Sequence, residues 1–100
     1  MNQSRLEASA AQLRPLLDAE DATNGMHIQC RRGAIVLSRE EPAEPPEKPE
    51  IDPRFRLTPL GPNEFGLSLY RRNRWERLPF QGTLQDLVEV MNSAVAHWAV

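Results

Sequence analysis

The chain has 100 residues, 40% of them apolar, which is enough for one compact domain and too few for two. Twelve basic and fourteen acidic residues give a formal net charge of −2, which excludes nucleic-acid binding by bulk positive charge. The single cysteine excludes an intramolecular disulfide, and no apolar run approaches the roughly 18 to 20 residues of a membrane span. The first residues lack the apolar core of a signal peptide, so we expect a single cytoplasmic domain over residues 1–100.

A helix is predicted over residues 5–14. Ser4 and Glu7 have the spacing of a capping box, and apolar residues then recur at helical spacing, at Leu6, Ala10, Leu13 and Leu17. Proline inside a helix costs about 3 kcal/mol because it removes a hydrogen bond and clashes with the preceding turn. We therefore expect the helix to end near Arg14, or to restart with Pro15 in its first turn.

Residues 26–39 are predicted to form one or two strands. Their larger apolar side chains favour extended structure, namely Ile28, Ile35, Val36 and Leu37. Gly33 follows Arg31 and Arg32, a position that indicates either a tight hairpin or a bulge.

Residues 40–50 differ in composition from the rest of the chain. They contain five glutamates, four prolines and one lysine, a net charge of −4. Such a segment cannot bury enough apolar surface to offset the entropy lost on ordering. We interpret it as a flexible, extended connector biased toward the polyproline II conformation. The alternative is an acidic arm that docks on a basic partner or on the protein's own arginines.

The second half predicts a three-stranded meander over residues 54–78, followed by a helix over 84–98. A turn with proline at its second position lies at 61–64, and Arg72-Asn73 joins the second and third strands. Thr83 is suited to cap the helix, with Asp86 favourable near its positive end. One apolar stripe then continues through Leu84, Leu87, Val88, Met91, Ala94, Val95 and Trp98.

Strand alternation predicts which side chains share a face of this sheet. A two-residue turn in the second hairpin makes Tyr70 face Trp75. A four-residue loop in the first hairpin places Phe55 and Leu57 on the same face as these aromatics, and the leucines of the middle strand on the other. Both faces would then be apolar, so the C-terminal helix is expected to cover one and the N-terminal helix the other. The predicted fold class is α+β, a mostly antiparallel sheet with packed helices.

The sequence offers little for catalysis or metal binding. His27, His97 and Cys30 are its only histidines and cysteine. His27 and Cys30 are three residues apart in a predicted strand, so they point to opposite faces. These three residues are too few for a four-ligand zinc site, and no glycine-rich phosphate loop is present. We expect no enzymatic activity, no cofactor and no metal.

Arginine accounts for eleven of the twelve basic residues. Four lie in the predicted hairpin at 70–77, whose candidate interaction residues are Tyr70, Arg71, Arg72, Arg74, Trp75 and Arg77. Guanidinium groups bind phosphates and stack on bases, as aromatic rings also do. The alternative is that the two aromatics form a cross-strand pair in the core and the arginines are solvated. Trp98 is a further candidate, either closing the helix stripe or anchoring a partner protein.

By elimination, the sequence favours a non-catalytic accessory or adaptor protein that acts through protein–protein contacts. The alternative is binding of RNA or single-stranded DNA through the hairpin at 70–77. No membrane partner is expected. Pairing of exposed edge strands leaves a homodimer open.

Overall fold

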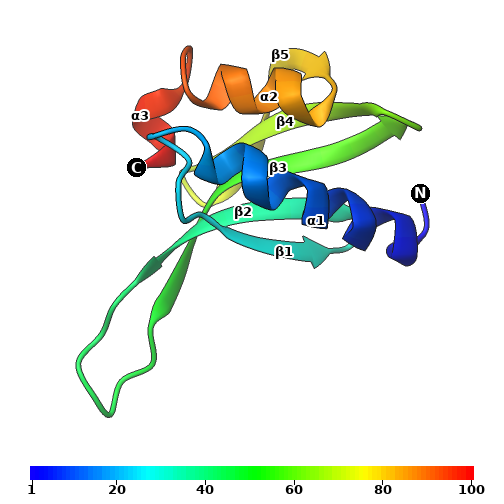
Figure 1. Cartoon of the computed structure of the whole chain (residues 1–100). Helices are drawn as coiled ribbons and strands as arrows, with labels where there is room; N and C mark the ends of the chain where they lie inside the picture. The colour runs from blue at the N-terminus through cyan, green and yellow to red at the C-terminus, as the bar shows by residue number, and fades with distance from the viewer.

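The computed structural model describes all 100 residues and confirms the α+β class. The elements in chain order are α1 (Gln3–Asp18), β1 (His27–Arg31), β2 (Ala34–Glu41), β3 (Glu50–Gly61), β4 (Glu64–Arg71), β5 (Arg74–Gly82), α2 (Leu84–Met91) and α3 (Ala96–Ala99). The strands form one antiparallel meander in the order β1-β2-β3-β4-β5. The helices lie on one side of this sheet, and α1 contacts α2 (Figure 1). None of the helices is both long and apolar enough to cross a membrane.

Helix α1 is longer than predicted at both ends. The backbone N–H of Arg5 donates to Asn2 Oδ1 at 2.9 Å, so Asn2 caps the helix and the Ser4 capping box is wrong. The helix continues through Pro15, so the predicted end near Arg14 is also wrong. Leu17 is completely buried, and burying a leucine contributes about 1.5–3 kcal/mol. That gain is comparable to the proline penalty of about 3 kcal/mol.

The turns of the β1–β2 and β4–β5 hairpins follow the prediction. Arg32 and Gly33, with φ of 50° and 75°, join β1 to β2. Arg72 and Asn73, with φ of 53° and 64°, join β4 to β5. Positive φ at both central residues is the conformation that matches the twist of two-residue hairpins. The predicted hairpin at Gly33 and the two-residue turn at 72–73 are therefore confirmed.

The β3–β4 turn lies at the predicted residues 61–64, but the register of the strands beyond it differs from the prediction. Gly61 pairs with Glu64, and Pro59 pairs with Phe65 across a register shift. Leu60 lies at this irregularity with 46% of its surface exposed. The predicted loop would pair Leu60 with Phe65, so the predicted register is wrong by one residue. A shift of one residue moves every side chain of the strand to the opposite face.

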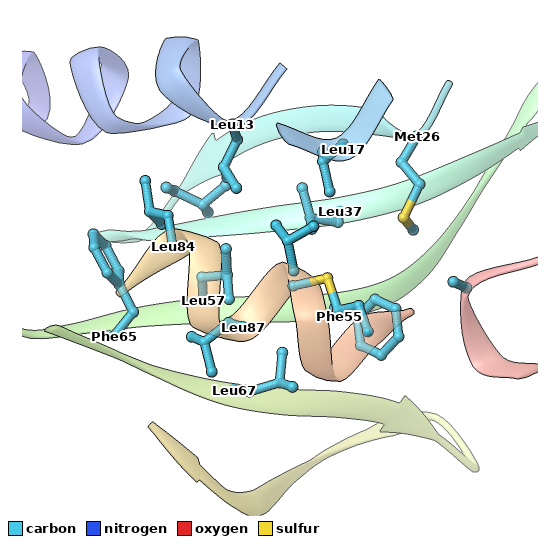
Figure 2. Close-up of a cluster of buried hydrophobic side chains, with 14 of the residues drawn as sticks. Leu13, Leu17, Met26, Leu37, Phe55, Leu57, Phe65, Leu67, Leu84 and Leu87 are labelled. Carbon is cyan, nitrogen blue, oxygen red and sulfur yellow. The ribbon is translucent and has the colours of Figure 1, made fainter. Parts of the chain in front are cut away.

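As a consequence, the large apolar side chains gather on a single face. Phe55 and Leu57 lie opposite Leu69 and Leu67 and not on the face of Tyr70 and Trp75. Figure 2 shows strand residues directed toward leucines of α1 and α2. The expected cover of the second face by the N-terminal helix is therefore wrong. We call the uncovered side of the sheet the open face.

The last strand and helix also differ from the prediction. Strand β5 continues through Pro79 to Gly82, with a register shift relative to β4. Proline is tolerated there because β5 is an edge strand with a bulge. Helix α2 begins with Thr83 as its predicted cap, and Asp86 completes a capping box by accepting from the Thr83 N–H. The helix ends at Met91, so the predicted continuous helix to residue 98 is wrong.

Asn92 explains the early end of α2. Its Nδ2 donates to the Val88 carbonyl at 2.8 Å and to Thr23 Oγ1 at 3.1 Å. Its Oδ1 accepts from the Ala22 N–H at 3.1 Å. These bonds fix Asn92 to the loop after α1. The apolar periodicity of residues 84–98 could not reveal contacts with residues about 70 positions earlier in the chain.

Arg39, on β2, connects the α1–β1 loop and the end of α3 to the sheet. Its guanidinium donates to the carbonyls of Ala22, Asn24 and Ala99, each at 2.7 Å. Burial lowers the pKa of Arg39, and the nearby charges of Arg54 and Arg14 lower it further. One side chain of β2 thus joins the α1–β1 loop to the end of α3.

Replacing Arg39 should therefore destabilise the fold. We expect Arg39→Lys to lower the free energy of unfolding by about 2 kcal/mol, because one ammonium cannot reproduce three diverging hydrogen bonds to a charged donor. Urea denaturation measures the change. Arg5→Lys, on the exposed side of α1, is the control and should shift stability by no more than about 0.5 kcal/mol. A stability of Arg39→Lys equal to the wild type would show that the three bonds contribute nothing.

Asp18 makes the stability of the fold depend on pH in the acidic range. Its carboxylate accepts from the Gly25 N–H at 2.9 Å and pairs with Arg14 at 2.7 Å. The Gly25 hydrogen bond, followed by the Arg14 hydrogen bond, lowers the pKa of Asp18 below its usual 3.8. A carboxyl with a lowered folded-state pKa contributes stability above its unfolded pKa, and the contribution is lost as pH falls through the folded value.

We therefore expect Asp18→Asn to be less stable than the wild type at about pH 6, with the difference narrowing as pH falls below about 4. Urea midpoints at a series of pH values measure this. Asp21→Asn is the matched control, because Asp21 is exposed in the same loop. A difference between wild type and Asp18→Asn that stays constant down to about pH 2 would contradict the assignment.

Candidate functional site on the open face

The open face contains a broad hollow of about 540 Å³. It is lined by Arg31, Arg32, Gly33, Ala34, Val36, Pro53, Arg56, Thr58, Tyr70 and Trp75. These residues come from the β1–β2 turn and from all five strands, so the meander is what brings them together. Three of the ten are arginines and none is acidic. The hollow is therefore an electropositive surface with an aromatic floor.

The two aromatics form the cross-strand pair that alternation predicts. Tyr70 is the register partner of Trp75, and their rings meet edge to face with centroids 4.9 Å apart at 66°. Both side chains are half-buried rather than part of the buried core. They consequently offer apolar surface to a ligand while stabilising the hairpin.

Arg56, on β3, reaches across β4 to the ring of Trp75 on β5. Its guanidinium carbon lies 4.9 Å from the Trp75 ring centroid, a cation–π contact that holds the charge on the open face. Arg56 makes no ion pair, and its Nε is buried without a hydrogen-bond partner in the chain. A carboxylate or phosphate reaching this face would supply the acceptor that the guanidinium lacks.

Arg77 lies on the same face, across β4. A Cβ placed on Gly66 would overlap the guanidinium of Arg77. The glycine therefore leaves room for the arginine to lie flat on the sheet. Arg77 is exposed and makes no ion pair.

The remaining arginines of the hairpin are divided between two environments. Arg71 pairs with Glu76 at 3.3 Å, which compensates part of its charge. Arg72 and Arg74 are exposed at the turn and make no ion pair. Arg71, Arg72 and Arg74 thus form a partly neutralised tip beside the hollow, whereas Tyr70 and Trp75 line it.

Trp98 lies apart from these residues. It is half-buried against the core cluster on the side of the helices, with its ring 5.1 Å from that of His97. Its carbonyl accepts from Arg54 Nη1 at 3.4 Å. The structure does not bring Trp98 together with the hairpin candidates.

The residues considered for chemistry are dispersed. His27 is exposed on β1, whereas Cys30 packs against the core cluster. Burial raises the pKa of the Cys30 thiol, and the charge of Glu7 adds to this. No three side chains of His, Cys, Asp or Glu gather closely enough to hold a metal ion.

Sequence reasoning missed Arg56, Val36 and Thr58 as members of the site. They lie on β2 and β3, outside the arginine-rich hairpin, and reach the same face only through register. Only the register shift at Leu60, which the sequence pattern did not reveal, places Arg56 and Thr58 on the face of Tyr70 and Trp75. Comparisons with protein-family models, curated proteins and solved structures find no match to this chain.

The charge of the open face can be measured at Trp75. In a Trp98→Phe background Trp75 is the only tryptophan, and we expect iodide to quench it more strongly than caesium because the arginines attract anions. Arg56→Gln should reduce the iodide quenching and leave neutral acrylamide quenching at least as strong. Arg5→Gln on α1 should change neither. Equal quenching of Trp75 by iodide and caesium would contradict a positive face.

Proposed function

We propose that this chain is a non-catalytic accessory protein of the cytoplasm that binds an acidic, extended segment of a partner protein on its open face. The observation that carries the proposal is the hollow itself: three arginines and no carboxylate surround a half-buried Tyr70–Trp75 pair. The thiol of Cys30, which is free, is compatible with a reducing compartment. The proposal assigns no catalytic residue.

The shape and chemistry of the face support an extended peptide. A flat sheet surface accommodates an extended chain along its length, and the apolar atoms of Val36, Tyr70 and Trp75 can contact its side chains. Arg56 is positioned to bind a carboxylate bidentately, since its guanidinium is held over the tryptophan. Charge complementarity of this kind supplies specificity and association rate more than raw affinity.

Single-stranded nucleic acid is the second candidate. The exposed, unpaired Arg72 and Arg74 at the hairpin tip favour it. Against it, Trp75 already contacts Arg56 on its ring and Tyr70 at close range, so less of the indole is free to stack on a base. We therefore favour an acidic peptide as the ligand.

Fluorescence anisotropy tests the proposal with a labelled peptide of five Glu-Pro repeats, and with the Gln-Pro peptide as matched control. We expect the acidic peptide to bind, the neutral one not to bind, and Arg56→Gln to weaken binding about tenfold or more. Raising salt from about 50 mM to about 500 mM should also weaken it.

Labelled ten-residue oligouridine is measured alongside. Tighter binding of this RNA than of the acidic peptide, lost in Arg72→Ala/Arg74→Ala, would replace the proposal with the nucleic-acid function. If the acidic peptide does not bind even when nothing else occupies the open face, the proposed function is overturned.

A further inference from the structure

Residues 40–50, which we call the acidic arm, extend from the sheet as a narrow ribbon. Figure 1 shows the segment between β2 and β3 running well beyond the rest of the sheet. Its base is a continuation of these strands, with Glu40 paired to Ile51 and Glu41 paired to Glu50. Because the ribbon is hydrogen-bonded to its root, it continues the direction of the strands and does not fold back over the chain's own open face.

The charge of the arm is uncompensated. Its five glutamates and one lysine carry a net charge of −4, and none of them takes part in an ion pair. Glu41 and Glu50 lie directly opposite one another, an arrangement of like charges that destabilises a strand pair. A cationic surface lying against the ribbon would remove this repulsion.

The same chain carries that cationic surface. The open face exposes Arg31 and Arg32 at the end of the sheet farther from the arm, and Arg56 nearer its middle. Pro53, at the root of the arm, lines the hollow as well. The hollow thus runs along the strands from the root of the arm to the β1–β2 turn. An extended arm from another molecule could lie along it in the same direction.

We propose that two copies of this chain associate reciprocally, the acidic arm of each lying along the open face of the other. The inference rests on the proposed function, because it uses the same face and the same ligand chemistry. Two sheets facing each other, antiparallel and offset by the length of the arm, place both arms over a partner face at once. This is a two-fold arrangement in which the two contacts are equivalent.

The arrangement specifies which charges meet. The tip of each arm, with Glu44 and Glu47, lies near Arg31 and Arg32 of the other copy. The paired base of the arm crosses nearer to Arg56. Since both contacts form together, the second is effectively intramolecular, and two weak contacts give a stronger dimer.

A charge swap at exposed positions tests the dimer. The face variant is Arg31→Glu/Arg32→Glu and the arm variant is Glu44→Lys/Glu47→Lys; all four positions are exposed, so the fold should tolerate both. By sedimentation equilibrium at about 100 mM salt, we expect wild type to dimerise and each variant alone to dissociate at least about tenfold more readily.

The mixture of the two variants provides the decisive measurement. In a heterodimer the lysine arm meets the glutamate face and the acidic arm meets the arginine face, so both contacts are complementary. We expect the mixture to form a one-to-one heterodimer with nearly wild-type affinity. Glu7→Lys/Glu89→Lys changes the same charge on exposed helix positions and should dimerise like the wild type.

Three outcomes would overturn the inference: a monomeric wild type, a dimer indifferent to both charge variants, or a mixture that fails to associate. Failure of the dimer is distinguished from failure of the proposed function by measuring binding of the acidic peptide to the arm variant, whose open face is free. Peptide binding by that variant together with a monomeric wild type leaves the proposed function standing and removes the dimer. No peptide binding by the arm variant removes the proposed function itself.

Discussion

The side-chain parity of β3 relative to β4 determines most of this structure. Because a register shift at Leu60 follows the pairing of Gly61 with Glu64, Phe55 and Leu57 face the same side as the β4 leucines. Burying a large apolar side chain contributes about 1.5–3 kcal/mol, so the side that collects them is the side on which helices pack. The other side is left with the arginines and the aromatic pair.

The arginines fall into two groups: some bind the chain's own backbone carbonyls, and others are free on the open face. Arg14, Arg39 and Arg54 bind backbone carbonyls and thereby join loops and helix ends to the sheet. The arginines on the open face have no such partners, although the composition of the chain makes no distinction between the two groups. The net charge of −2 therefore conceals a positive face and a negative arm at different places in the molecule.

Local signals predicted the local features. The Thr83–Asp86 cap, the turns at Gly33 and at Arg72-Asn73, and the facing of Tyr70 and Trp75 depend on residues close in sequence. The end of α2 depends on the bonds of Asn92 to a loop 70 residues away, and the length of α1 depends on where Leu17 is buried. The open face was missed for a related reason: its residues are brought together by strand register, and the unrecognised one-residue shift at Leu60 moves Arg56 to the other side of the sheet.

The arm and the open face of one chain have complementary chemistry, and this links self-association to partner binding. An acidic segment of a partner and the arm of a second copy would compete for the same arginines. The apparent affinity for a partner is then the intrinsic affinity reduced by the fraction of faces that are free. In the proposed dimer, dilution would release the arms, whereas a higher chain concentration would occupy the faces. The acidic arm would therefore set the concentration range in which the open face is available to other proteins.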